Sequence, residues 1–148
     1  MTELNRISGL HHYAYRCRNA EETRSFYEDL LGLPLAHVIQ ADNVPSTGAS
    51  DPYVHLFFEY ADGSYIAFFD LGDETACIPD PETPAWVNHF AMQVKTVAEV
   101  EEWKKRLEAA DIEVVGVTDH EFVKSVYFFD PNGHRLELAT NTGDPANW

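Results

Sequence analysis

Three side chains in this sequence have types and positions that could together hold a divalent metal ion. His12 and His89 each lie near the start of a strand-like segment, and Glu137 stands between two leucines, Leu136 and Leu138. Imidazole nitrogens and carboxylate oxygens are common ligands of divalent transition metals. A carboxylate in the middle of an apolar strand needs a partner, because burying an unpaired charge is costly. A metal ion would supply that partner, although an edge strand or a solvated face would also accommodate a single glutamate.

This glutamate belongs to a predicted β-hairpin at residues 125–139. Its turn is the run Asp-Pro-Asn-Gly at residues 130–133, in which proline presets φ, Asn and Gly tolerate left-handed geometry, and Asp can bond the nearby backbone. An aromatic run precedes the turn and an alternating apolar segment follows it. Alternation in the second strand places the two leucines on one face and Glu137 on the other.

The same order of elements is predicted twice along the chain. In the first half it comprises a strand at residues 9–17, a helix from Asn19 to Gly32, a long loop at 42–52, and a strand, turn and strand at 53–69. In the second half it comprises a strand at residues 86–94, a helix capped by Thr96 and Glu99, a strand at 112–117, and the hairpin.

The two halves align with one change of offset. A shift of 77 residues pairs His12 with His89, and after the first-half loop a shift of 70 pairs Ile66 with Leu136. We therefore expect an α+β fold of two paired βαβββ modules that form a curved mixed sheet around a metal-binding cleft. The expected organisation is a single domain, 1–148, with a first module at residues 7–72, a linker at 73–85 and a second module at 86–141.

Strand alternation also predicts which side chains face the cleft. Phe90 and Met92 belong to an apolar row that should pack under a helix, so His89 should face the opposite side. The repeat places His12 on the cleft side, and the hairpin does the same for Glu137. A single strand histidine is more often a hydrogen-bonded or surface residue. Two histidines at equivalent positions and a carboxylate on one face favour a metal site.

Composition limits the classes of partner. The chain has 148 residues, 45% of them hydrophobic, and a formal net charge of −15. An acidic protein is repelled by nucleic acid and by anionic membranes, so we expect neither as a partner. No apolar run approaches the ~20 residues that span a bilayer, and the N-terminus lacks a signal-peptide pattern. Cys17 and Cys77 have no metal-site spacing and are expected to be reduced. These features favour a cytoplasmic location.

The sequence resembles the vicinal oxygen chelate superfamily over about residues 7–140. This superfamily holds glyoxalases, extradiol dioxygenases, fosfomycin and bleomycin resistance proteins, and methylmalonyl-CoA epimerases. The matching segments are residues 10–14, 26–33, 88–91 and 127–138. The resemblance implies that His12, His89 and Glu137 are the metal ligands. It also implies that His12 rather than His11 is the ligand, with His11 pointing to the helix side.

One departure from the family pattern indicates an activity. Isomerases of the family use a fourth ligand, Glu or Gln, where the shift of 70 places Ala67. Three ligands leave enough coordination positions for a bidentate catecholate and dioxygen, as in non-haem Fe(II) oxygenases. We therefore expect an extradiol-type dioxygenase that cleaves a catechol- or hydroquinone-like ring. Its metal would be Fe(II), with Mn(II) as a possibility, its reactants a small aromatic substrate and O2, and its assembly a homodimer.

Other residues fit this reading, each with an ordinary alternative. Tyr127 resembles the substrate-binding tyrosine of extradiol enzymes, and His120 resembles an acid–base residue near the same strand; they could instead be a core tyrosine and a surface histidine. The expected substrate-binding residues, which could equally belong to the core, are His55, Phe57, Phe69 and Phe129. His37 and His134 are expected at the surface.

Three alternatives remain within the family. A fosfomycin-resistance-like transferase shares the ligand set, but residues 139–148 contain no basic residue to bind a phosphonate. A glyoxalase-like lyase or isomerase lacks its fourth ligand at Ala67. A bleomycin-resistance-like drug-binding protein would suit the acidic charge, but it would not need three converging ligands.

Overall fold

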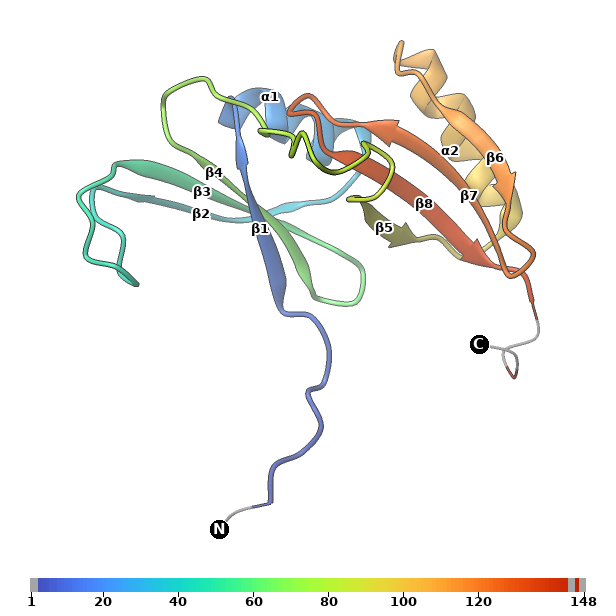
Figure 1. Ribbon diagram of the computed structural model, residues 1–148, viewed down its shortest axis with the longest axis horizontal. Coiled ribbons are helices and arrows are strands. Elements are labelled where there is room, and N and C mark those ends of the chain that lie inside the picture. The colour runs from blue at the N-terminus through green and yellow to red at the C-terminus, as the bar shows by residue number, and fades with distance from the viewer. Residues whose placement is uncertain (1–2, 144–145, 147–148) are drawn as a thin grey trace. The chain divides into compact units, whose positions relative to one another are not determined.

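The computed structural model describes residues 3–143 and 146 of the chain (Figure 1). The chain divides into two compact units, Met1–Cys77 and Ile78–Trp148. That these units act as one domain stays a prediction. In the described part of the chain, no helix has both the length and the hydropathy that crossing a bilayer requires.

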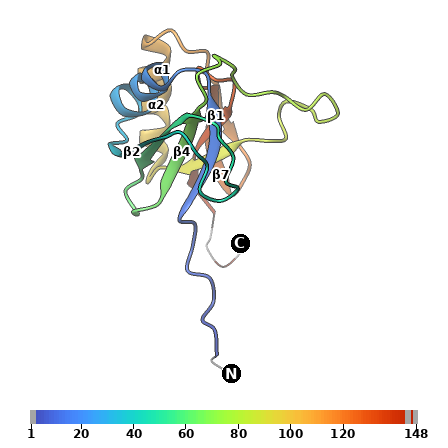
Figure 2. The ribbon, with the colours of Figure 1, turned by 90° about the vertical axis from the view of Figure 1, so that its left-hand side faces the viewer.

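The first unit is a four-stranded mixed sheet with one helical segment. Its strands are β1 (His12–Cys17), β2 (Leu35–Ala41), β3 (Tyr53–Glu59) and β4 (Tyr65–Asp70). They are ordered β1-β4-β3-β2, with β1 parallel to β4 and the other neighbours antiparallel. The helical segment consists of α1 (Ala20–Arg24) and a π-helical continuation, η1 (Ser25–Leu30). Figure 2 shows α1 beside the strands, and α1 contacts β4.

Local chemistry begins and ends this helical segment as predicted. The Asn19 side chain accepts a hydrogen bond of 2.9 Å from the backbone N–H of Glu22, which satisfies one of the donors at the helix start. At the other end Gly32 has a φ of +74°, a left-handed conformation that glycine adopts without strain. The Leu33 N–H then bonds the Tyr27 carbonyl at 2.9 Å and closes the last turn.

The core of the first unit lies between this helix and one face of the sheet. Tyr27 is fully buried, and its ring centroid lies 4.8 Å from that of Phe68 and 5.5 Å from that of Phe58. Ile66 is buried on the same face of β4. Because strand neighbours point to opposite faces, the residues between these core positions lie on the other face of the sheet.

The second unit repeats this architecture. Its elements are β5 (Phe90–Gln93), α2 (Val97–Ala109), β6 (Val115–Asp119), β7 (Val123–Phe129) and β8 (Arg135–Asn141). The strand order is β5-β8-β7-β6, with β5 parallel to β8, which corresponds position by position to the first unit. The predicted βαβββ repeat is therefore confirmed.

Helix α2 covers one face of the second sheet and contacts β6, β7 and β8 (Figure 1). Val100 and Leu107 on the helix are fully buried, as are Val126 and Leu136 on the strands. Thr96 caps the helix by accepting a hydrogen bond of 3.1 Å from the Glu99 N–H. The Glu99 carboxylate returns to the N–H of Lys95, one residue before the cap residue that the capping-box prediction implied.

Several strand boundaries differ from the prediction, and the strand expected at 9–17 begins only at His12. The strand expected at 86–94 begins only at Phe90, the first residue that pairs with β8, opposite Leu136. Residues 35–41 form β2, which the sequence did not delimit. The strand expected at 112–117 lies two to three residues later, as β6.

The hairpin turn forms as predicted, but the expected exposure of one of its residues, His134, is wrong. The Asp130 carboxylate accepts hydrogen bonds of 2.9 and 2.8 Å from the N–H groups of Asn132 and His134, and Gly133 has a φ of +90°. His134 was expected at the surface but is only 6% exposed, with its ring 5.8 Å from that of Phe90. Phe90 belongs to β5, the strand beside β8, and contributes to the burial of the imidazole. His37 is exposed, as expected.

Candidate functional site

Two of the three predicted metal ligands meet in the second unit. His89 immediately precedes β5, and Glu137 lies in the middle of β8, where it pairs in register with Ala91. The His89 Nε2 atom lies 3.0 Å from Glu137 Oε2, and the glutamate side chain is only 8% exposed. The carboxylate is therefore held in a largely dry environment beside an imidazole nitrogen.

The hydrogen bond made by His89 Nδ1 limits which protonation states the contact between Nε2 and Glu137 can have. His89 Nδ1 lies 3.0 Å from the backbone carbonyl of Val87, and a carbonyl oxygen can only accept, so Nδ1 carries a proton. In a neutral imidazole Nε2 then has a lone pair, and that lone pair faces the carboxylate. Two acceptors at this separation need a cation between them or a second proton on the ring.

A divalent metal ion fits this arrangement. Two ligand atoms that each lie about 2.1 Å from an octahedral ion, at neighbouring positions, stand about 3.0 Å apart. The observed distance from Nε2 to Oε2 is 3.0 Å. A metal-binding histidine also typically donates its other N–H to a backbone carbonyl, as His89 does to Val87.

Tyr127 joins the carboxylate to His120. Its hydroxyl donates to Glu137 Oε1 at 3.1 Å, lies 2.9 Å from His120 Nε2 and accepts a longer bond of 3.4 Å from the Ser125 hydroxyl. Register pairing of Tyr127 with Glu137 puts both on one face of the sheet. Burial raises the pKa of Tyr127, and the charge of Glu137 raises it further, so the hydroxyl is protonated at neutral pH.

Arg135 is a further charged residue of this face that the sequence analysis did not single out. Its guanidinium carbon lies 4.0 Å from the centroid of the Tyr127 ring, a cation–π contact, and Nη1 donates to the Trp86 carbonyl at 3.1 Å. The signal was present in the sequence, because Arg135 has the same strand parity as Glu137. Phe129, opposite Arg135 in register, is half-exposed on this face.

The third predicted ligand, His12, is the first residue of β1 in the first unit. Its Nδ1 lies 2.8 Å from Nδ1 of His11, so one of the two rings donates to the other. When His12 is the donor, its Nε2 keeps the lone pair that a metal requires. The expectation that His11 points to the helix side is wrong: its ring contacts His12 and Tyr65, at centroid distances of 5.0 and 5.8 Å.

Ala67 occupies the position equivalent to Glu137. In the first sheet Ala14 pairs in register with Ala67, and in the second sheet Ala91 pairs with Glu137. The two units therefore have corresponding registers, and the first contributes no carboxylate at this point. Within either unit, the described residues include no group of three or more His, Cys, Asp and Glu side chains placed to hold a metal.

The predicted substrate-binding residues of the first unit form an aromatic row. The His55 ring stacks on Phe69 at 3.7 Å with an interplanar angle of 18°, and lies 4.2 Å from Phe57, whose ring is 5.4 Å from His12. His55 is 8% exposed, and its Nε2 has no hydrogen-bond partner among the described residues. Burial, reinforced by the charge of His12, lowers the pKa of His55 to about 4.

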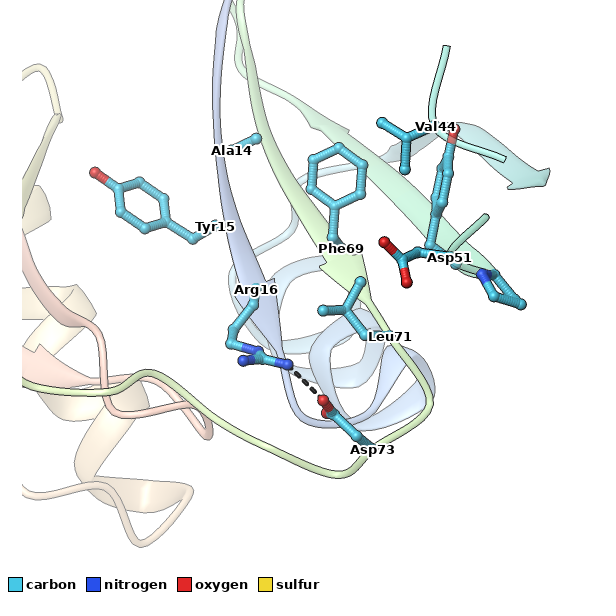
Figure 3. Close-up of a pocket in the computed structure, with 10 residues that line it drawn as sticks. Ala14, Tyr15, Arg16, Val44, Asp51, Phe69, Leu71 and Asp73 are labelled. Atoms are coloured by element: carbon cyan, nitrogen blue, oxygen red, sulfur yellow. Dashed lines mark hydrogen bonds and ion pairs between the residues drawn. The ribbon is translucent and has the colours of Figure 1, made fainter. Parts of the chain in front are cut away.

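A pocket of ≈ 590 Å³ opens on the same unit (Figure 3). Its apolar lining comprises Ala14, Val44, Pro52, Tyr53, Phe69 and Leu71. Arg16, Asp51 and Asp73 supply its charges, and the Arg16 guanidinium pairs with the Asp73 carboxylate at 2.6 Å. Of the predicted substrate-binding residues, Phe69 lines this pocket, and the ring of His55 stacks on that of Phe69.

Comparisons with known proteins agree with this fold. The chain is 25% identical over 144 residues to metallothiol transferase FosB of Staphylococcus epidermidis, a match that covers 92% of this chain and 86% of that protein. It is 27% identical over 144 residues to Glyoxylase I 4 of Arabidopsis thaliana, covering 90% and 71%.

Solved structures show the same architecture. Fosfomycin resistance protein FosX of Listeria monocytogenes, complexed with Mn(II) and sulfate, superposes with a TM-score of 0.67 at 22% identity, covering 93% of this chain and 95% of that one. A mutant of that protein complexed with Mn(II) and 1S,2S-dihydroxypropylphosphonic acid gives a TM-score of 0.65. The Glyoxalase/Bleomycin resistance protein/Dioxygenase superfamily matches residues 9–138, and the chain belongs to this superfamily.

Proposed function

We propose that this protein is a metal-dependent enzyme that transfers a nucleophile to, or rearranges, a small oxygen-rich substrate. His12, His89 and Glu137 are its metal ligands, and Mn(II) is the first candidate ion, with Fe(II) as the second. The observation that carries the proposal is the 3.0 Å contact between His89 Nε2 and Glu137 Oε2, with His89 Nδ1 held by the Val87 carbonyl. His12 is proposed as the third ligand because it is the repeat-equivalent of His89 in the sequence.

The comparisons support transfer or lyase chemistry more than ring cleavage. The relatives named above are a metallothiol transferase and a glyoxylase, and FosX was crystallised with Mn(II). Neither relative is named as an extradiol dioxygenase. No basic residue follows Glu137 to bind a phosphonate, but two arginines could take that role. Arg135 shares the face of Glu137, and Arg16 shares that of His12.

A bound divalent ion would act as a Lewis acid toward a substrate oxygen. Proton transfer to or from the substrate would be carried out by side chains of the protein. The Tyr127 hydroxyl donates a hydrogen bond to Glu137 Oε1, so its oxygen can accept a hydrogen bond from His120 Nε2. His120 is exposed, and this chain of hydrogen bonds connects the site with solvent. Tyr127 thus orients Glu137 and can pass a proton to or from a substrate oxygen.

Two observations keep extradiol dioxygenase as the second candidate. Tyr127 and His120 are hydrogen-bonded to each other beside the carboxylate, as the ring-cleaving reading requires, and aromatic rings line the face that holds His12. In that case the metal is Fe(II) and the reactants are a catechol and O2. Homodimer formation also stays a prediction.

Metal content and a set of parallel assays test the proposal. Protein purified without added metal is analysed by elemental mass spectrometry, and Mn(II) binding is followed by electron paramagnetic resonance. We expect one ion per chain, and a large loss of affinity in Glu137→Gln. Thiol consumption with fosfomycin, isomerisation of the methylglyoxal–glutathione adduct, and oxygen uptake with catechols then separate the reactions. Failure of Mn(II), Fe(II) and Zn(II) to bind would refute the proposal.

A further inference from the structure

The pocket of the first unit has the composition of a site for an anion attached to a flat apolar group. We propose that it binds the body of the substrate: an aromatic ring system that carries one carboxylate or phosphonate, with the ring against Phe69 and the anion on Arg16. The inference rests on the proposed function, because it names the substrate of that site. It concerns only residues of the first unit (Figure 3).

The ring-binding wall is built from Phe69 and Tyr53, whose centroids are 5.4 Å apart at an interplanar angle of 68°. One face of the Phe69 ring stacks on the buried ring of His55, its register neighbour on β3. Because stacking already restricts the rotation of the Phe69 ring, a planar ligand can pack against the exposed part of that ring with little further loss of side-chain entropy. Val44 and Leu71 add further apolar surface to the lining of the pocket.

Arg16 supplies the site for the anion. Its guanidinium reaches the pocket from β1 and already holds a carboxylate, that of Asp73, at 2.6 Å. Asp73 follows β4 and its side chain is 49% exposed, so water can solvate this carboxylate when it leaves. Exposed ion pairs contribute little to stability, and a ligand carboxylate or phosphonate can therefore replace Asp73 on the guanidinium.

Pocket volume indicates the size of the substrate. The ≈ 590 Å³ available is in the range of sites for drug-sized ligands. The phosphonic acid bound to FosX has a three-carbon chain and would fill only a small part of such a space. This pocket therefore suits a substrate with one or two rings.

The geometry of β1 connects the pocket with the proposed metal ligand. Every second residue of β1 lies on the same face of the strand, and these residues are His12, Ala14 and Arg16. A strand rises about 3.3 Å per residue, so the Cα atoms of His12 and Arg16 lie about 13 Å apart. Ala14 between them is small and lines the pocket. A substrate anchored on Arg16 can extend past Ala14 toward His12.

Binding of 2-naphthylacetate to the full-length protein tests this inference. Its neutral amide has the same shape without the charge, and acetate has the charge without the ring. We expect the acid to bind roughly tenfold more tightly than the amide in calorimetry, and acetate to bind far more weakly. In spectra of 13C-labelled methyl groups, Val44 and Leu71 should shift with the acid.

Variants of the pocket sharpen the test. Arg16→Gln should remove the preference for the acid over the amide, whereas Arg18→Gln, which changes an arginine paired with Glu22 outside the pocket, should not. Asp73→Asn should tighten binding several-fold, because the acid no longer competes with a carboxylate. Ala14→Leu should weaken the acid and the amide equally by filling the pocket.

Equal affinity for acid and amide, or an unchanged preference in Arg16→Gln, would overturn the inference. Each titration is run with metal-free and with Mn(II)-loaded protein. If Mn(II) does not bind, the proposed function fails, and the affinities of the metal-free protein still decide whether the pocket takes an aryl carboxylate. If Mn(II) binds but the acid shows no preference, the inference fails alone.

Discussion

Replacement of His55 by phenylalanine should change how the stability of this protein depends on pH. The imidazole is buried between Phe57 and Phe69, and its Nε2 has no hydrogen-bond partner among the described residues. Burial lowers its pKa from 6.5 to about 4, because protonation would place a charge in an aromatic environment. Phenylalanine has a similar shape and fits the same aromatic row, but it does not titrate.

The sign and size of the effect follow from the two pKa values. Between pH 6.5 and 4 the unfolded chain binds a proton at His55 that the folded chain does not. Stability from the neutral imidazole is therefore fully present above pH 6.5 and is lost as the pH falls toward 4. The shift from 6.5 to about 4, at about 1.4 kcal/mol for each pKa unit, amounts to roughly 3 kcal/mol.

The assay compares the free energy of unfolding of metal-free wild-type protein and His55→Phe at several pH values. Urea denaturation is followed by far-ultraviolet circular dichroism, which reports on both units. We expect the advantage of the wild type over the variant to fall by roughly 3 kcal/mol between pH 7 and pH 4. His37→Phe is the matched control, because His37 is an exposed histidine whose ring lies 6.1 Å from the same Phe57.

Two results would refute this reasoning. One is a difference in unfolding free energy that stays constant from pH 7 to pH 4. The other is a His55 ring signal that titrates near pH 6.5 in carbon-detected nuclear magnetic resonance. Either result would mean that water or a polar group reaches Nε2 of His55 in solution.

Three further substitutions probe the site and its scaffold. Tyr127→Phe removes the hydroxyl bonded to Glu137, so activity should fall about 10- to 100-fold in steady-state assays while the melting temperature changes little. His11→Ala removes the acceptor that selects the metal-binding tautomer of His12, so Mn(II) affinity should fall about tenfold in titrations; unchanged affinity would contradict that role. Asp130→Ala leaves two buried N–H groups without an acceptor and should lower the unfolding free energy by about 2–3 kcal/mol in urea denaturation, and a smaller loss would show that water replaces the carboxylate.

Local sequence rules predicted much of the fold. Asn19 as a helix cap, Gly32 as its end and the Asp-Pro-Asn-Gly hairpin turn all depend on contacts between residues a few positions apart. The same is true of strand alternation, which placed Glu137 and Tyr127 on one face. Such contacts depend on backbone geometry that repeats in every protein, so the sequence is enough to identify them.

Burial was harder to predict. His134 was expected at the surface, yet its ring lies beside that of Phe90, 44 positions earlier in the chain. Strand β5 was expected to be longer than it is, because its start depends on where its pairing with β8 begins. Both outcomes depend on which segment lies beside the residue, and no local pattern contains that information.

The sequence alone determined the repeat, the positions that correspond between the two halves, and the residue types of the candidate site. Only the tertiary structure decided that His89 donates to Val87 and turns its Nε2 atom toward Glu137, that Arg135 lies over Tyr127, and that Asp73 meets Arg16 across 57 positions. The reason is physical: the period of a strand sets the direction of a side chain, but its partner is set by the contacts that form when distant segments pack.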